Sequence, residues 1–235
     1  MSGVPSVERV ALVACGSYNP ITNMHLRMFE VARDHLHATG RYKVVCGIIS
    51  PVHDDYKKKD LVSSKHRFAM CKLAAETSDW IRVDDWEISQ PEWTCTRDVL
   101  KHYEEGFNKH GILSNFSRDQ SHLNSGAIRV MLLCGNDFLE SFAIPGLWKA
   151  DHIDELTKKF GMAVISRSSC DAEKLIYEQD MIYANRTTVH LIKEWLYNEI
   201  SSTKVRKALR RGESVKYVVL DSVIGYIERN GLYKS

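Results

Sequence analysis

The stretch VALVACGSYNPITNMHLRMFEVARDHL, residues 10–36, decides the fold class. Its first six residues are apolar and mostly β-forming, and its last eleven have the periodicity of an amphipathic helix. Between them, Gly16, Asn19 and Pro20 are turn formers and Thr22 is a suitable N-cap. The stretch therefore predicts a buried strand that passes through a tight turn into a helix.

Five further apolar or β-branched runs follow, at 43–50, 80–83, 128–134, 162–166 and 187–192. Helical periodicity fills most of the gaps between them. Near-continuous apolar strands that alternate with helices are typical of a parallel sheet covered on both faces and built from right-handed βαβ units. We therefore predict one α/β domain that spans the whole chain, with its ligand beyond the carboxyl ends of the strands.

The bulk composition excludes several classes of protein. The chain has 235 residues, of which 44% are hydrophobic and 26% charged, and this is ordinary globular composition. A formal net charge of +2 gives no field that attracts nucleic acid or an anionic membrane. No apolar stretch is long enough to span a bilayer, and the first nine residues, MSGVPSVER, resemble neither a signal peptide nor an import sequence. We expect a cytosolic or nuclear protein with no nucleic-acid or membrane partner.

Two features are predicted to be structural. The six cysteines never occur as C-x-x-C, which argues against a zinc site and a disulfide framework and favours reduced core residues. Residues 110–126 are rich in Ser, Asn and Gly and have no periodicity, so we predict a mobile surface insertion there.

The turn after the first strand has the features of a phosphate site. Gly16 permits close approach of a ligand to the backbone, and the following helix N-terminus offers unpaired N–H groups. The side chain of His25, in the first helical turn, leans back toward the same point. The alternative is an ordinary turn with His25 on the surface. Other phosphate loops are excluded, because a dinucleotide fingerprint needs three glycines and the P-loop-like spacing at 106–112 has Ile112 in place of the lysine.

Two more strand ends repeat this pattern. Gly135 and Asp137 follow the strand at 128–134, where the aspartate either caps or charges the N-terminus of the next helix, or accepts a bond from a ribose hydroxyl or an amine. On this motif alone, the cap is the preferred interpretation. After the last strand, Ser202 is placed to cap a short helix and Arg206 flanks it, which suits the outer phosphates of a triphosphate. The alternative there is a solvated basic helix.

GSYNPITNMH at 16–25, together with ISSTKVR at 200–206, resembles the paired signatures of the nucleotidyltransferase superfamily, and in particular the eukaryotic nicotinamide mononucleotide adenylyltransferases. The superfamily usually has His-x-Gly-His at the helix start, whereas this chain has TNMH at 22–25, the variant of the eukaryotic branch. The middle insertion lacks the basic nuclear signal of some relatives. Further segments match in order: SPVHDDYKKKDL (50–61), PEWTCTRDVL (91–100), LLCGNDFLESFAIPGLWK (132–149) and ISSTKVRKALRRGESVKYVV (200–219).

The resemblance implies a Rossmann-like, doubly wound fold and the conversion of ATP and nicotinamide or nicotinate mononucleotide to the dinucleotide and pyrophosphate. It implies Mg²⁺ carried on the ATP phosphates, no metal ligand from the protein, and an optional homo-oligomer. The residues expected to contact ATP are Gly16, Ser17, His25, Lys58, Gly135, Asp137, Ser202, Thr203 and Arg206, with His25, Lys58 and Arg206 as the catalytic set. The residues expected to form the pyridine-nucleotide pocket are Ser17, Tyr56, Trp93, Thr96, Leu147 and Trp148.

General chemistry agrees with these assignments. The attacking phosphate is already ionised, so the reaction needs positioning and charge neutralisation and no enzyme nucleophile. His25 would stabilise charge on the α-phosphate, and the faces of Trp93 and Trp148 would attract the cationic pyridinium ring unless they are ordinary core aromatics. Two alternatives stay open: transfer to another acceptor, such as phosphopantetheine, or a cytidylyl reaction; and a chaperone-like binding role on the same scaffold.

Overall fold

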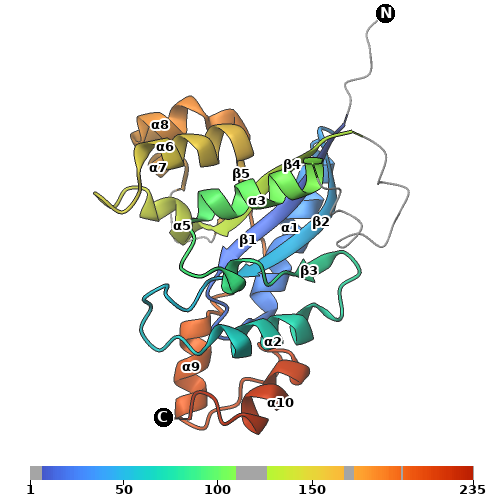
Figure 1. The fold of residues 1–235 in the computed structure, drawn as a ribbon, viewed down its shortest axis with the longest axis vertical. Helices are drawn as coiled ribbons and strands as arrows, with labels where there is room; N and C mark the ends of the chain where they lie inside the picture. The colour runs from blue at the N-terminus through green and yellow to red at the C-terminus, as the bar shows by residue number, and fades with distance from the viewer. Residues whose placement is uncertain (1–6, 110–125, 167–171, 197, 235) are drawn as a thin grey trace, which may run out of the picture.

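The computed structural model describes residues 7–109, 126–166, 172–196 and 198–234 (Figure 1). It contains a six-stranded sheet in the order β3-β2-β1-β4-β5-β6, and every pair of neighbouring strands is parallel. The predicted parallel α/β sheet is therefore confirmed. The strands are β1 (Glu8–Gly16), β2 (Tyr42–Pro51), β3 (Ile81–Val83), β4 (Ile128–Gly135), β5 (Met162–Ser166) and β6 (Val189–Lys193).

The strand order reverses between β1 and β4. The chain winds outward from β1 to β3, returns to pair β4 with the other side of β1, and then winds outward again to β6. Such a reversal leaves a crevice beyond the carboxyl ends of the two central strands. These ends are Gly16 and Gly135, the two glycines that the sequence singles out.

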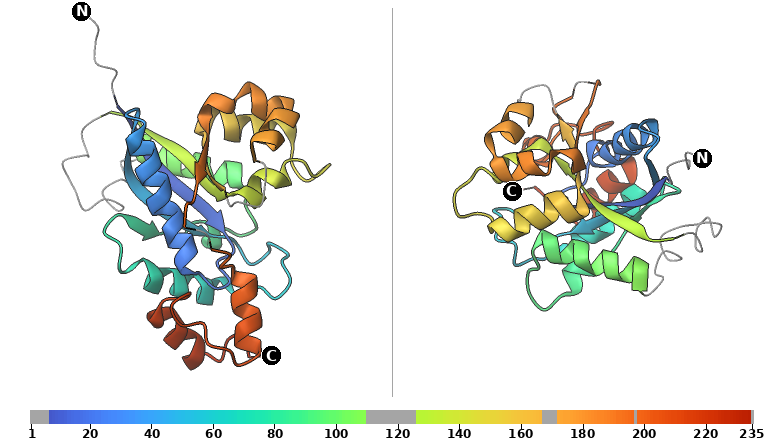
Figure 2. Two further views of the ribbon diagram at one scale, coloured as in Figure 1. Left: turned by 180° about the vertical axis from the view of Figure 1, so that it is seen from behind. Right: turned by 90° about the horizontal axis from the view of Figure 1, so that it is seen from above.

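Alternate residues of β1 enter two separate cores, which explains why the strand is apolar throughout. Val10, Leu12 and Ala14 belong to one core, and Ala11 and Val13 to the other. Figure 2 shows the sheet between its two helical layers. The first core is covered by α1 (Asn23–Ala38), α2 (Ser64–Ala75), α9 (Ser202–Arg210) and α10 (Asp221–Arg229). The second is covered by α3 (Thr96–Lys109), α5 (Asn136–Ser141), the π-helical turn Glu155–Phe160 that continues α6 (Ala150–Asp154), α7 (Ala172–Glu178) and α8 (Asp180–Ala184).

Five of the six cysteines lie in the part of the chain that the structure describes, and all five are free thiols, three of them buried. The predicted insertion at 110–126 lies outside the described residues apart from Gly126. Within the described ranges, no helix combines the length and apolarity needed to cross a bilayer.

Candidate active site

The β1–α1 loop, residues 17–22, folds back over the end of its own strand. Tyr18 has a positive φ of 44°, and its hydroxyl donates to the Ala14 carbonyl at 2.7 Å. A Cβ on Gly16 would lie 3.2 Å from the Tyr18 ring. The glycine predicted for close approach of a ligand thus also lies in tight contact with the loop, where a larger residue would have to displace the Tyr18 ring.

The first turn of α1 orients His25. Thr22 is the N-cap of the helix, as predicted, and its backbone N–H donates to His25 Nδ1 at 3.0 Å. An imidazole nitrogen that accepts a hydrogen bond carries no proton, so the proton of the neutral ring is on Nε2. The ring also makes an edge contact with Tyr18, with 5.2 Å between centroids. This orientation is compatible with the donor role predicted for His25, and its contact with a phosphate stays a prediction.

Lys58 reaches the same loop from the connection between β2 and α2. Its Nζ donates to Ser17 Oγ at 3.2 Å. The structure therefore brings together two residues that the sequence assigns to the phosphates and that lie 41 positions apart.

The N-terminus of α9 is joined to the β1–α1 loop. Ser202 Oγ donates to the Pro20 carbonyl at 2.8 Å. The predicted cap is wrong by one residue, because Ser201 is the N-cap and accepts from the Lys204 N–H at 3.2 Å. Since the Ser202 hydroxyl proton is already donated to Pro20, the groups of this turn suited to an anion are the Thr203 side chain, which is exposed, and the backbone N–H groups of the first turn.

Arg206 lies beneath the loop. Its side chain is almost inaccessible, with the residue 8% exposed, and Nη1 donates to the Asn19 carbonyl at 2.7 Å. Nη2 lies 3.5 Å from Thr203 Oγ1, and Nε has no hydrogen-bond partner among the described residues. A buried N–H without a partner is costly, and an anion bound beside it would remove that cost. This fits the predicted phosphate contact, but much of the side chain holds the loop, which the sequence did not predict.

The end of β4 supplies a carboxylate. Gly135 is the N-cap of α5 and Asp137 is exposed in the first turn, with no side-chain capping bond. The predicted capping bond of Asp137 is therefore wrong, whereas its charge does lie in the first turn of α5, as the same interpretation also allowed. Its Oδ1 lies 2.6 Å from the point that a Cβ on Gly135 would occupy, so the glycine lets the carboxylate fold back over the strand end. Asp137 thus lies at the switch point, and its contact with a ribose stays a prediction.

The aromatic residues predicted for the pyridine nucleotide lie in two separate groups. Tyr56 and Trp93 are both exposed, and their rings are 6.3 Å apart at a tilt of 32°. Trp148 is partly buried and lies in edge contact with Phe138 and Phe142, with 5.1 Å between centroids in each pair.

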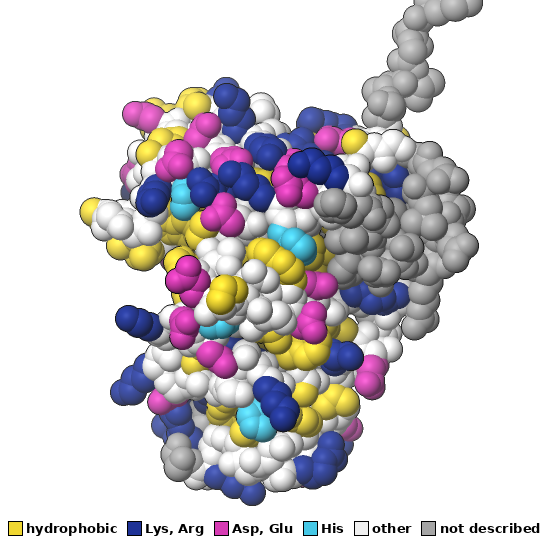
Figure 3. Space-filling view, viewed as in Figure 1, with side chains coloured by type: hydrophobic (Ala, Val, Ile, Leu, Met, Phe, Trp, Pro, Cys, Tyr) yellow, Lys and Arg dark blue, Asp and Glu magenta, His cyan; other side chains and the backbone are white. Residues whose placement is uncertain are grey.

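A hydrogen bond and an ion pair hold the segments that carry these rings. Trp148 Nε1 donates to Ser141 Oγ at 2.9 Å, while Leu147 and Ile144 project from the same connection, where Figure 3 shows hydrophobic side chains at the edge of the molecule. Thr96 is the first residue of α3, and the adjacent Arg97 forms an ion pair with Asp151 of α6 at 3.3 Å. This pair ties the segment that carries Trp93 and Thr96 to the one that follows Trp148.

Charges of both signs alternate over α3 and the neighbouring turn (Figure 3). Lys101 and Lys159 pair with Glu155 and Glu104 there, at 3.0 and 2.6 Å. The described side chains of α3 and this turn therefore form no patch of one sign.

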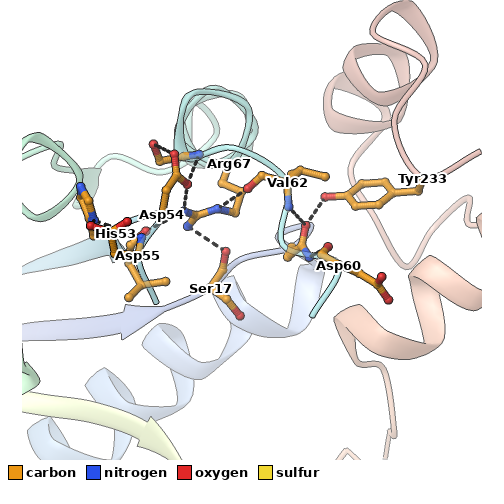
Figure 4. A network of polar contacts seen from close by, with 11 residues as sticks. Ser17, His53, Asp54, Asp55, Asp60, Val62, Arg67 and Tyr233 are labelled. Carbon is orange, nitrogen blue, oxygen red and sulfur yellow. Dashed lines mark hydrogen bonds and ion pairs between the residues drawn. The ribbon is translucent and has the colours of Figure 1, made fainter. Parts of the chain in front are cut away.

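Arg67, on α2, was not predicted from the sequence, and its side chain is fully buried. The guanidinium donates to the carbonyls of Val62, Ser17 and Val52 at 2.9, 3.2 and 2.6 Å, and to Asp54 Oδ1 at 2.9 Å (Figure 4). It thus joins the β1–α1 loop to the loop that carries Lys58. A weak signal was present, because Arg67 shares helical spacing with the buried residues Met70, Cys71 and Ala74.

Glu87, in the 3₁₀ turn Glu87–Ser89, is a second residue that was not predicted from the sequence. The carboxyl is buried, accepts from Ser50 Oγ at 2.5 Å at the end of β2, and has its pKa raised to about 8 by burial. Ser50 and Arg67 act in the opposite direction and do not overcome the burial. The carboxyl is therefore mostly neutral at pH 7.

The sheet is doubly wound and side chains from separate strand ends meet around one loop, an arrangement typical of α/β nucleotide-binding proteins. Residues 13–208 match the cytidylyltransferase-like family. The chain is 46% identical to nicotinamide/nicotinic acid mononucleotide adenylyltransferase 1 of Bos taurus, over 96% of this chain and 89% of that protein. It is 42% identical to the nicotinamide-nucleotide adenylyltransferase of Drosophila melanogaster, over 97% of this chain and 62% of that one. The chain belongs to the nicotinamide/nicotinic acid mononucleotide adenylyltransferase family.

A solved structure supports the fold. The chain resembles the Plasmodium falciparum nicotinic acid mononucleotide adenylyltransferase complexed with NaAD, with a TM-score of 0.65 and 20% identity over 96% of this chain and 97% of that one. At this identity the likeness establishes the Rossmann-like architecture alone.

Proposed function

We propose that this protein transfers the adenylyl group of ATP to nicotinamide or nicotinate mononucleotide and releases pyrophosphate. The observation that carries the proposal is the convergence of His25, Lys58 and the start of α9 on the β1–α1 loop, each joined to it by a hydrogen bond of 2.8 to 3.2 Å. The names and high identity of the curated relatives support the same reaction.

The proposed step needs no covalent intermediate. A phosphate oxygen of the mononucleotide attacks the α-phosphorus of ATP, the new P–O bond forms, and the bond to the β-phosphate breaks as pyrophosphate leaves. Negative charge rises on the α-phosphate oxygens, and the Nε2–H of His25 is the donor that we assign to it. Lys58 and the first turn of α9, with Arg206, are assigned to the charge on the outer phosphates.

We propose that Mg²⁺ arrives bound to the phosphates of ATP. In the described part of the chain, no three His, Cys, Asp or Glu side chains are grouped as metal ligands. Donors that suit phosphate oxygens surround the loop instead, and Mg²⁺ commonly binds mainly through substrate phosphates and water. The ion would neutralise phosphate charge.

The acceptor is inferred from the aromatic groups. A cationic pyridinium over a tryptophan face gains roughly 0.5–2 kcal/mol. Trp93 is exposed beside Tyr56, and Trp148 is fixed by two phenylalanines and a hydrogen bond. We therefore assign these rings to the pyridine nucleotide, with Thr96 and Leu147 at its edge, and Gly135 and Asp137 to the ATP ribose.

The test is a panel of donors and acceptors. The purified protein is incubated with Mg·ATP or Mg·CTP and with nicotinamide mononucleotide, nicotinate mononucleotide or phosphopantetheine, and pyrophosphate release is measured. We expect release with ATP and the two pyridine mononucleotides. Release only with phosphopantetheine, or only with CTP, would refute the proposal.

A further inference from the structure

Asn19, in the β1–α1 loop, joins three distant parts of the chain. Its side chain is buried, and Nδ2 donates to the Asp60 carbonyl at 2.7 Å. Its Oδ1 accepts from the Tyr233 hydroxyl at 2.7 Å, and its carbonyl accepts from Arg206. Figure 4 shows Tyr233, which lies in the segment that follows α10, directed toward the part of the chain that carries Asp60 and Val62. The amide nitrogen and the amide oxygen of the Asn19 side chain are therefore both used in holding the loop.

The backbone around Asn19 is also unusual. In the ranges that the structure describes, four non-glycine residues have positive φ: Tyr18, Asp60, Tyr217 and Tyr233, at 44°, 59°, 69° and 62°. Three of the four adjoin Asn19 or form a hydrogen bond with it. Left-handed backbone is unfavourable for such residues and persists where surrounding contacts determine it, most often at functional sites. The concentration of such residues at Asn19 indicates that the loop is held in one conformation.

We propose that Tyr233 is a positioning residue for adenylyl transfer, which fixes Asn19 and through it the phosphate-binding conformation of the β1–α1 loop. The inference rests on the proposed function. Asn19 lies between Ser17, which contacts Lys58, and Pro20, which accepts from Ser202. A loosened Asn19 would displace both contacts and the carbonyl that holds Arg206, and all three belong to the ATP side of the site.

Tyr233 is suited to this role because its hydroxyl stays protonated. Burial raises the pKa of Tyr233 well above its ordinary value. The hydroxyl therefore donates to Asn19 throughout the physiological pH range. Its ring belongs to the first core, so a change to phenylalanine removes the hydrogen bond and keeps the packing.

Tyr226 offers a matched control. It lies on α10, contacts the same core, and its hydroxyl is 3.0 Å from His66 Nδ1, away from the loop. Tyr233→Phe and Tyr226→Phe each delete one hydroxyl from one hydrogen bond. We expect Tyr233→Phe to raise the KM for ATP by about threefold to tenfold, which is the effect of one such bond, and to change the KM for the mononucleotide less, because Ser17 is the one residue of the loop predicted to contact both substrates. Tyr226→Phe should change neither KM.

Two further measurements separate the possible outcomes. Hydrogen exchange of residues 17–21, taken below the Tm of both variants, should be faster in Tyr233→Phe only, which detects the loop without using turnover. ATP affinity by calorimetry should fall in the same variant. If both variants lower the Tm and neither changes exchange or ATP affinity, Tyr233 is only a core residue and the inference is wrong. If the wild-type protein binds ATP but makes no dinucleotide, the proposed function fails, and the exchange and calorimetry still decide whether Tyr233 positions the loop.

Discussion

The Arg206 guanidinium donates to the backbone carbonyl of Asn19 at 2.7 Å, across 187 positions of sequence. This bond joins the two segments that carry the family signatures, 16–25 and 200–206. Ser202 and Pro20 form a second bond between the same segments. The two signatures are therefore neighbours in space, because the start of α9 is hydrogen-bonded to the β1–α1 loop.

His25→Ala should lower kcat by about 10²- to 10³-fold, because removal of one donor to transition-state charge typically has this effect. ATP affinity should change much less, since the contact strengthens only as charge develops. The measurements are kcat and the Kd for ATP by calorimetry. His66→Ala, at a histidine that contacts Tyr226, is the control. An unchanged kcat would remove His25 from the mechanism, and a protective cellular effect that survives His25→Ala would support the chaperone-like alternative.

Arg67→Lys should weaken both stability and ATP binding. Lysine keeps the charge but cannot reach three carbonyls and Asp54 at once, and each buried carbonyl left unpaired costs about 1–3 kcal/mol. The free energy of unfolding in urea should fall accordingly, and the KM for ATP should rise because Ser17 is released. Arg211→Lys, at an exposed ion pair with Glu213, is the control and should have little effect. Equal stability of the two variants would contradict the role of Arg67 in holding the two loops together.

Trp148→Ala should raise the KM for the mononucleotide several-fold more than the KM for ATP. The ring is placed by Phe138, Phe142 and Ser141 on the β4 side of the crevice, where we assign the pyridine. Trp195→Ala provides the control, since that ring is 79% exposed and lies in the connection between β6 and α9. Equal changes in the two KM values would count against the assignment.

Glu87 should make stability fall as pH rises. The carboxyl has a pKa of about 8 in the folded protein and near 4.5 in the unfolded chain, so the fold binds its proton more tightly. The contribution of Glu87 to the free energy of unfolding is complete below pH 4.5. It decreases by an amount on the order of a few kcal/mol as the pH rises to about 8. Glu87→Gln should flatten this dependence in urea unfolding at pH 5, 7 and 9, whereas Glu92→Gln, at an exposed position, should not. Parallel curves for wild type and Glu87→Gln would show that the carboxyl titrates normally.

The sequence predicts the sheet well and the packing beneath the site poorly. Runs such as residues 10–15 are apolar because alternate side chains enter two cores, so these continuous apolar runs identify the strands. The last strand begins at Val189 and not at 187, because Arg186–Thr188 forms a 3₁₀ turn. These differences are confined to element ends, where local preferences are weak.

Arg67 and Asn19 illustrate what local patterns do not contain. A charged residue on a helix is normally interpreted as solvated, and only the three-dimensional meeting of the loops shows that Arg67 has buried acceptors. Asn19 is a turn former in the sequence, but its partners Asp60 and Tyr233 are 41 and 214 positions away. Hydrogen bonds across such separations depend on the completed fold.

The most direct test of adenylyl transfer follows the phosphorus atoms of ATP. The protein is incubated with Mg²⁺, nicotinamide mononucleotide and ATP labelled at the α-phosphate, and in a parallel reaction with ATP labelled at the β- and γ-phosphates. We predict that the α label appears in the dinucleotide and that the other labels appear only in pyrophosphate. A dinucleotide that lacks the α label, or no dinucleotide at all, would contradict the account.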